Sequence, residues 1–315
     1  MSLPPSDHFN GKTFFNPGAP AHAGLLDLFK WKLTSRAALW PAEVPVAAAK
    51  LPERPAAPGL AATWIGQSTF LLQSAEATLV TDPVFSDRAS PFAWAGPKRV
   101  APPAVALEAL PPIDVVLLSH DHYDHCDLAS LRRLARRDQP LVVTPVGHKA
   151  LLASVGLTRV AELDWWETHA APAGVEVTLV PSQHWSRRSP FSTNQRLWGG
   201  FMVRTGGRLA YFAGDSGYAE GLFAEIGRRC GAPDLAMIPI GAYEPRWFMK
   251  DAHMNPEEAV RVHRDVGSRL SVAMHWGTFQ LTDEARDEPV RALREACGAA
   301  VSNFRALELG GSVLA

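Results

Sequence analysis

Past residue 60, the chain runs twice through the same succession of predicted elements: a hairpin, a buried apolar strand, an amphipathic helix and another strand. The first hairpin (69–81) ends at Asp82, and the second (201–213) ends at Asp215. Each half therefore has an apolar sheet face to bury, which two sheets packed face to face with helices outside can satisfy. The pattern predicts an α/β (α+β) fold, a four-layer αββα sandwich.

The other members of the two halves occur in matching order. They are the apolar runs 113–118 and 235–240, helices near 128–137 and 256–266, and strands at 141–144 and 270–274. Strand ends and their loops can meet at one edge of such a sandwich, where rigid elements hold polar groups outside the core. A functional site is expected at that edge.

Residues 1–60 differ from the rest because they are rich in proline and alanine, apart from a helix-like run at 23–40. They are interpreted as an N-terminal arm with one helix, followed by a single hydrolase domain over 61–315. The N-terminus lacks the charged and apolar regions of a signal peptide, and no run of about 18 apolar residues occurs. We expect a protein that is not exported.

The charge balance and the cysteines limit which partners and which cellular compartment we expect. The 31 basic and 32 acidic residues nearly balance, which argues against nucleic acid as a partner. The three cysteines, Cys126, Cys230 and Cys297, lie far apart and form no CxxC pair. That spacing argues against a disulfide framework and favours the cytoplasm.

The segment 119–127 concentrates histidine and aspartate between a predicted strand and a predicted helix. Residues two apart in an extended chain point the same way, so His120 and His122 can share one metal ion. The turn into the helix then directs Asp124 and His125 at a second ion. The alternative is that Asp124 or Asp127 caps the helix and the histidines are simply exposed.

Two zinc ions need more donors, and three candidates follow apolar strands downstream: His184, Asp215 and His275. Taken alone, each residue also has a structural interpretation. A histidine can simply have its hydrogen bonds satisfied within the fold, and the Gly-Asp-Ser-Gly sequence around Asp215 is typical of a turn. Together with the HxHxDH motif they predict a binuclear centre. One metal takes His120, His122 and His184, the other takes Asp124, His125 and His275, and Asp215 bridges them.

The resemblance extends beyond these ligands, over residues 63 to 280 or so. The matching blocks are 64–69, 81–85, 119–125, 183–185, 213–218, 238–249, 256–259 and 275–279. They resemble the metallo-β-lactamase superfamily and, within it, the branch of N-acylphosphatidylethanolamine-hydrolysing phospholipases D and its bacterial relatives. Aspartate rather than cysteine at position 124 is similar to the two-metal hydrolases of that superfamily.

The resemblance implies the metallo-β-lactamase fold and a binuclear, zinc-dependent phosphodiesterase, with other divalent transition metals as alternatives. Hydroxide bridging two metals can attack phosphorus at neutral pH. Asp124 or Asp215 is expected to accept a proton. Asp82 is expected behind the metal, holding a ligand imidazole, unless it only caps its strand.

The substrate groove is predicted from the block that follows the second apolar strand. The resemblance implies that His253 contacts substrate near the metals, although it can equally be a surface histidine before a helix. Tyr243, Arg246 and Trp247 are expected to line the groove, because arginine pairs with phosphate and aromatic rings cover acyl chains. The alternative for the aromatic residues is the core.

Three functions stay open at this point. The first is hydrolysis of a phospholipid-like phosphodiester, the second is opening of a sugar-phosphate or acyl-homoserine lactone or another small ester, and the third is a non-catalytic metal-binding module. The early helix can contact a lipid surface at the inner membrane face through its apolar and basic residues: Leu25, Leu26, Leu28, Phe29, Trp31 and Leu33 beside Lys30, Lys32 and Arg36. It can instead dock on the protein or on a second subunit of a homodimer.

Overall fold

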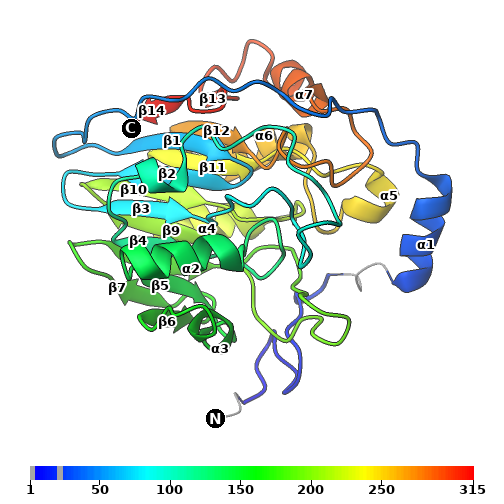
Figure 1. Ribbon diagram of the computed structural model, residues 1–315, viewed down its shortest axis with the longest axis horizontal. Coiled ribbons are helices and arrows are strands. Elements are labelled where there is room, and N and C mark those ends of the chain that lie inside the picture. The colour runs from blue at the N-terminus through cyan, green and yellow to red at the C-terminus, as the bar shows by residue number, and fades with distance from the viewer. Residues whose placement is uncertain (1–3, 20–23) are drawn as a thin grey trace.

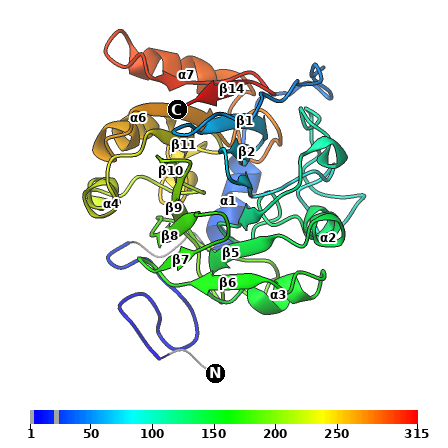
Figure 2. The same cartoon turned by 90° about the vertical axis from the view of Figure 1, so that its left-hand side faces the viewer.

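The computed structural model describes residues 4–19 and 24–315 and contains two seven-stranded sheets. The first sheet has the order β14 (Ser312–Leu314), β1 (Ala61–Gly66), β2 (Thr69–Gln73), β3 (Thr78–Thr81), β4 (Val115–Leu117), β5 (Leu141–Pro145) and β6 (Val160–Leu163). The second has the order β7 (Thr168–Ala170), β8 (Glu176–Val180), β9 (Gly200–Thr205), β10 (Arg208–Phe212), β11 (Leu235–Pro239), β12 (Leu270–Met274) and β13 (Phe304–Arg305). The sheets overlap in the view of Figure 1 and face each other in that of Figure 2.

The two sheets repeat one topology strand for strand. In the first, β14 to β3 pair antiparallel and β3 to β6 pair parallel. In the second, β7 to β10 pair antiparallel and β10 to β13 pair parallel. As a result β3, β4, β8, β10, β11 and β12 all end where the metal-ligand candidates begin, and we call this side of the sandwich the site edge.

Alternating side chains explain why these segments form strands buried on both faces. In β4, Val115 and Leu117 belong to the large core between the sheets, which also contains Leu179 and Phe201 of the second sheet. Val116 points the other way, into a core beneath α2. The strand is therefore apolar throughout, as its sequence requires.

Helices cover the outer faces. Figure 2 shows α2 (Leu128–Arg137) and α3 (Lys149–Ala153) on the side of the first sheet, with α4 (Leu222–Cys230) and α6 (Pro256–Asp265) on the side of the second. Helix α7 (Glu288–Cys297) packs on α6. A short α5 (Arg246–Met249) follows β11, and a 3-10 turn, η1 (Leu107–Ala109), precedes β4. The predicted αββα sandwich is confirmed.

The element bounds differ from the predictions mainly at one helix. Helix α1 (Leu25–Thr34) is shorter than the predicted run 23–40, of which Ala23 lies outside the described residues. The chain leaves the helix after Thr34 because the following segment bonds to the domain, with Ala38 N donating to Asp283 O and Trp40 Nε1 to Glu284 O. Within the described ranges, no helix is long and apolar enough to cross a membrane.

The N-terminal segment lies against the domain that begins with β1. Phe14 N donates to Asn194 O, Val44 N donates to Val100 O, and Leu60 N donates to Ala315 O. Its path passes α5 and then returns along the molecule to β1 (Figure 1).

Candidate metal centre

Three imidazoles converge at the site edge after β4 and β8. His122 Nδ1 lies 2.9 Å from His120 Nε2 and 3.2 Å from His184 Nε2. Nitrogen ligands about 2.0 to 2.1 Å from a tetrahedral zinc ion lie roughly 3.3 Å from one another. The spacing of the three nitrogens therefore suits a single zinc ion.

The outer hydrogen bonds of two of these rings fix which nitrogen carries the lone pair. Ser119 Oγ gives its proton to Asp82 Oδ2, so at 2.9 Å it accepts from His120 Nδ1. His184 Nδ1 donates to the carbonyl of Ala252, which can only accept. His120 Nε2 and His184 Nε2 are thus unprotonated and face one point, as metal ligands must.

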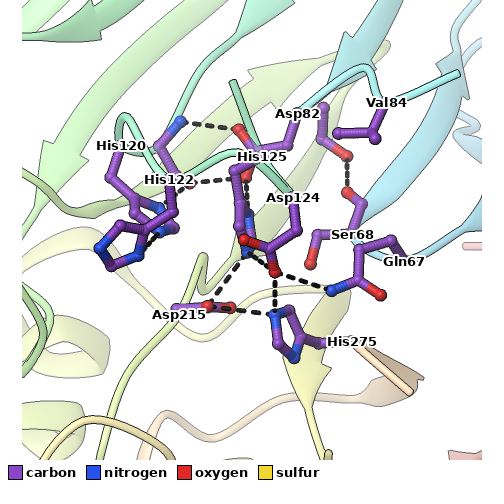
Figure 3. A network of polar contacts seen from close by, with 12 residues as sticks. Gln67, Ser68, Asp82, Val84, His120, His122, Asp124, His125, Asp215 and His275 are labelled. Atoms are coloured by element: carbon purple, nitrogen blue, oxygen red, sulfur yellow. Dashed lines mark hydrogen bonds and ion pairs between the residues drawn. The ribbon is translucent and has the colours of Figure 1, made fainter. Parts of the chain in front are cut away.

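A second donor set adjoins the first and is drawn in Figure 3. His275 Nε2 lies 3.0 Å from Asp124 Oδ2 and 3.1 Å from Asp215 Oδ2, and His125 Nε2 lies 3.0 Å from Asp215 Oδ2. Asp215 Oδ2 is also 3.9 Å from His184 Nε2. Asp215 therefore stands between the two sets, where a bridging carboxylate would lie.

Asp82, at the end of β3, lies behind the histidines. Its Oδ2 accepts from His125 Nδ1 at 2.7 Å, and its Oδ1 accepts from Ser119 N at 2.7 Å. These contacts orient His125 so that Nε2 faces the second donor set (Figure 3). Asp82 thus makes the contact expected of a carboxylate that orients a ligand imidazole, and a strand-end cap would make the bond to Ser119 N. Its role at a metal stays a prediction.

Unusual backbone conformations hold two of these residues. Asp82 has φ 30° and His275 has φ 60°, a region that side chains other than glycine rarely adopt. Beside His275, a Cβ on Gly241 would lie 2.2 Å from the His275 carbonyl oxygen. Only glycine fits there, so the β11 loop can pack directly against the end of β12.

Charges within the site suit cation binding. Burial raises the pKa of Asp124 and Asp215, but the adjoining His125 and His275 outweigh it and hold both values well below the usual range. Burial lowers the pKa of His120 and His184 well below 6.5. Two ionised carboxylates thus face two neutral imidazoles.

The two imidazoles of the second donor set, His125 and His275, are protonated instead. Although burial lowers it, Asp215 and Asp124 raise the pKa of His275 to about 9, and the pKa of His125 is raised likewise. These protons sit where the second donor set would hold a metal, and a divalent cation would displace them. Asp215 Oδ1, buried and without a hydrogen-bond partner among the described residues, is a further donor of the right kind. The residues present fit two metal ions.

His253 lies at the mouth of the donor sets. Its ring is 5.1 Å from that of His184, and its Nδ1 is 3.9 Å from Asp215 Oδ2. Nδ1 has no hydrogen-bond partner within the described part of the chain. Burial lowers the pKa of His253 to about 4, which leaves a neutral ring beside the site.

The three other groove candidates contact residues outside the two donor sets. Arg246 Nη2 binds both carboxylate oxygens of Glu258, at 2.9 and 2.8 Å, and its Nη1 donates to His253 O. Tyr243 is buried, and its hydroxyl donates to Glu288. Trp247 is 44% exposed at the site edge. In this arrangement Arg246 positions His253, and substrate contact by these three residues stays a prediction.

Gln67 is a site residue that the sequence analysis left without a role. Its Nε2 donates to Asp124 Oδ2 at 3.0 Å, and its carbonyl accepts from His275 N at 3.0 Å. It thereby joins two donors of the second set that are far apart in sequence. The only signal was its place in the matching block 64–69.

Two arginines in the loop between β8 and β9 bind Asp121, a contact that the sequence analysis did not predict. Arg196 Nη1 donates to Asp121 Oδ2 at 2.8 Å, and Arg188 Nη1 donates to Asp121 O at 2.9 Å. Since the same loop carries His184, these bonds fasten it to the loop of His120 and His122. Nothing in the spacing of the arginines indicated this role.

Comparison with known proteins agrees with this geometry. Residues 77–276 match a family described as the beta-lactamase superfamily domain. An N-acyl-phosphatidylethanolamine-hydrolyzing phospholipase D of Caenorhabditis elegans is 40% identical over 309 residues, which span 91% of this chain and 86% of the relative. An uncharacterized protein of Mycobacterium tuberculosis is 42% identical over 278 residues, 86% of this chain and 73% of the relative.

Solved structures share the fold at low identity. Igni18, a metallo hydrolase of Ignicoccus hospitalis, aligns with a TM-score of 0.61 and 20% identity over 81% of this chain and 98% of its own. An isothiocyanate hydrolase from Delia radicum gut bacteria aligns with a TM-score of 0.63 and 19% identity over 80% of this chain and 98% of its own. The chain therefore belongs to the metallo-β-lactamase superfamily, in the branch of the N-acylphosphatidylethanolamine-hydrolysing phospholipases D, and is a metal-dependent hydrolase.

Proposed function

We propose that the protein is a binuclear zinc phosphodiesterase that cleaves N-acylphosphatidylethanolamine-like lipids into a phosphatidic acid and an N-acylethanolamine. The observation that carries this proposal is the pair of donor sets that meet at Asp215, in a chain 40% identical to a phospholipase D of that specificity. Two bound zinc ions would activate water at neutral pH and offset negative charge on the phosphoryl oxygens.

The chain's own residues have separate tasks in this proposal. In this proposal Asp215 or Asp124 accepts a proton from the attacking water; Asp215 Oδ1, which lacks a hydrogen-bond partner within the described residues, is free for this task if Oδ2 alone holds the metals. The neutral ring of His253 can accept a hydrogen bond from the substrate or the leaving group. Arg246 holds the His253 backbone, and the Asp82 carboxylate keeps His125 oriented.

The proposed setting is the cytoplasm, next to the lipid that supplies the substrate. The cysteines Cys126, Cys230 and Cys297 are unpaired, which suits a reducing compartment. No part in nucleic-acid chemistry is proposed, because the charges balance.

The test is turnover by the zinc-loaded protein with four substrates: N-acylphosphatidylethanolamine, a simple phosphodiester, a sugar-phosphate lactone and an acyl-homoserine lactone. Metal analysis and product identification by mass spectrometry accompany each assay. We expect phosphatidic acid from the wild type and from His169→Ala, which changes a histidine outside both donor sets, and none from His120→Ala. Lactone opening without phosphodiester cleavage would replace the proposal with a lactonase, and no turnover of any substrate would overturn it.

A further inference from the structure

The loop between β8 and β9 carries His184, and residues 4–19 of the N-terminal segment lie against this loop. These residues turn back on themselves through an antiparallel bridge between Phe9 and Phe14. The two rings lie 4.5 Å apart and belong to the large core. Figure 1 shows the segment in dark blue beside the loop. Because it buries two aromatic rings in the core, the segment is a fixed part of the domain.

Two further contacts join the segment to the rest of the protein. The His8 ring stacks on Trp165, with 4.4 Å between the ring centres. Phe14 N donates to Asn194 O at 2.8 Å. Asn194 in turn exchanges two hydrogen bonds with Ser186, one from Asn194 N to Ser186 O at 2.8 Å and one from Ser186 N to Asn194 Oδ1 at 3.1 Å. The segment is thus fastened to the loop just past the metal-ligand candidate.

Asn16 contacts that candidate directly. Its Nδ2 donates to the His184 carbonyl oxygen at 2.7 Å, and its Oδ1 accepts from Trp198 Nε1 at 3.3 Å. Trp198 is fully buried and also donates to Ser182 O at 3.0 Å. A carbonyl can only accept and an indole N–H can only donate, so these partners fix the orientation of the amide. Asn16 therefore joins the two ends of the β8–β9 loop.

The backbone of His184 depends on such a contact. Residues 184–187 belong to no helix or strand, so ladder hydrogen bonds do not hold the His184 carbonyl. The side chain has its own restraint, since Nδ1 donates to Ala252 O at 2.9 Å. That bond sets the tautomer and the direction of the ring, but a shift of the backbone still moves Nε2. Ligand atoms must be held to within about 0.5 Å of the productive geometry.

We propose that Asn16 is a positioning residue for the zinc ion of the first donor set, and that the N-terminal segment is thereby part of the metal centre. Asn16 acts through the His184 backbone and is not itself a ligand. An amide is needed because it offers a donor and an acceptor on one planar group. The inference rests on the proposed function only in that the first donor set holds zinc, and it is independent of the substrate.

The test measures zinc affinity rather than turnover. Competition with a chromophoric chelator gives the affinities of the wild type, Asn16→Asp and Asn16→Leu. Aspartate has the same shape but turns a carboxylate oxygen toward the His184 carbonyl, and leucine makes neither bond. We expect either change to weaken one bound zinc ion by about tenfold or more and the other by less than about twofold. Asn10→Asp is the matched control, because Asn10 bonds to Lys12 and Thr13 within its own exposed turn, and it should leave both affinities unchanged.

A double-mutant cycle separates positioning of His184 from a general loss of structure. If Asn16 acts through His184, Asn16→Asp should cause no further loss of zinc affinity in a His184→Ala protein, where the ligand is already gone. Urea unfolding of the metal-free variants checks that each one folds, and Asn16→Leu takes the place of Asn16→Asp if the latter does not.

Additive losses in the cycle would overturn the role of Asn16, and so would wild-type zinc affinity in both Asn16 variants. The proposed function fails on a different result. Zinc binding by a wild-type protein that hydrolyses no phosphodiester would refute the phosphodiesterase and leave the role of Asn16 intact.

Discussion

Asp82 shows how one buried side chain can set the geometry of several ligands. Its carboxylate accepts hydrogen bonds from His125 Nδ1, Ser119 N and Ser119 Oγ, and Ser119 in turn fixes the tautomer of His120. Both donor sets therefore depend on it. Carboxylates in this position raise the basicity of the ligand and hold its ring in place.

Asp82→Asn should keep the fold and weaken metal binding. The amide has the same shape but no charge to hold the His125 ring, so we expect a loss of roughly 10- to 100-fold in zinc affinity. Competition with a chromophoric chelator measures the change. Asp114→Asn is the matched control, because Asp114 accepts from Thr78 N at the opposite end of the same strands. Equal zinc affinity in both variants would remove Asp82 from the site.

Arg196→Met should destabilise the metal-free protein. Asp121 is fully buried and loses its ion-pair partner, and breaking such a pair from one side costs about 3 kcal/mol. Urea unfolding at pH 7 gives the change in the free energy of unfolding. Adding Asp121→Asn to the variant should recover most of that loss, because the buried charge is then gone; a double variant no more stable than the single one would contradict this account.

At the scale of elements, the predicted positions of α2 and β12 coincide with the observed ones, at Leu128–Arg137 and Leu270–Met274. Both have strong local signals: Asp127 caps α2 by accepting from Ala129 N, and β12 is apolar except for Ser271. Helix α1 was overestimated because residues 35–40 have helical character but are held by Asp283 and Glu284. Tertiary hydrogen bonds overrode a local preference there.

The start of α6 offers a test at this scale. Asn255 accepts from Glu258 N while the Glu258 carboxylate accepts from Asn255 N, a reciprocal cap. Asn255→Ala should lower the free energy of unfolding by about 1 kcal/mol, and Asn255→Gly by only a few tenths. Thermal or urea unfolding of the zinc-loaded protein distinguishes them. Equal losses in the two variants would show that the cap is not the cause.

For the whole molecule, stability should depend on pH differently with and without metal. In the metal-free protein the raised pKa of His275 stabilises the fold fully below 6.5, and this contribution is lost as the pH rises through about 9. His125 acts in the same direction. We therefore expect the metal-free protein to lose on the order of 1 to 3 kcal/mol between pH 6.5 and 9.

The zinc-loaded protein should lack this loss, because the metal replaces those protons. Zinc binding at pH 7 should accordingly release protons, which calorimetry in buffers of different ionisation enthalpy can count. Urea unfolding across the same pH range measures the stability of both forms. A metal-free protein that grows more stable toward pH 9 would show that His125 and His275 are not held protonated.

Local patterns in the sequence are enough to predict the layers of the fold and the kinds of residue in the metal centre. Strand and helix periods are local properties, and two adjacent metal ions require a particular set of donors, so His120, His122, Asp124 and His125 could be found from spacing alone. His184, Asp215 and His275 followed from their places after apolar strands. The residue roles assigned to that centre stay predictions until metal is measured.

Contacts between distant segments determine how those donors are held and which surface stays exposed. Gln67 reaches Asp124 from 57 positions away, and Arg196 reaches Asp121 from 75, contacts that no local pattern encodes. Arg246 was predicted to line the groove because arginine pairs with phosphate, and the fold also gives it a carboxylate partner, Glu258. Both faces of α1 are apolar in sequence, and its packing on α5 alone determines that Trp31 is buried and Phe29 is not. Such partners are set by packing between distant segments, which residue type and spacing do not specify.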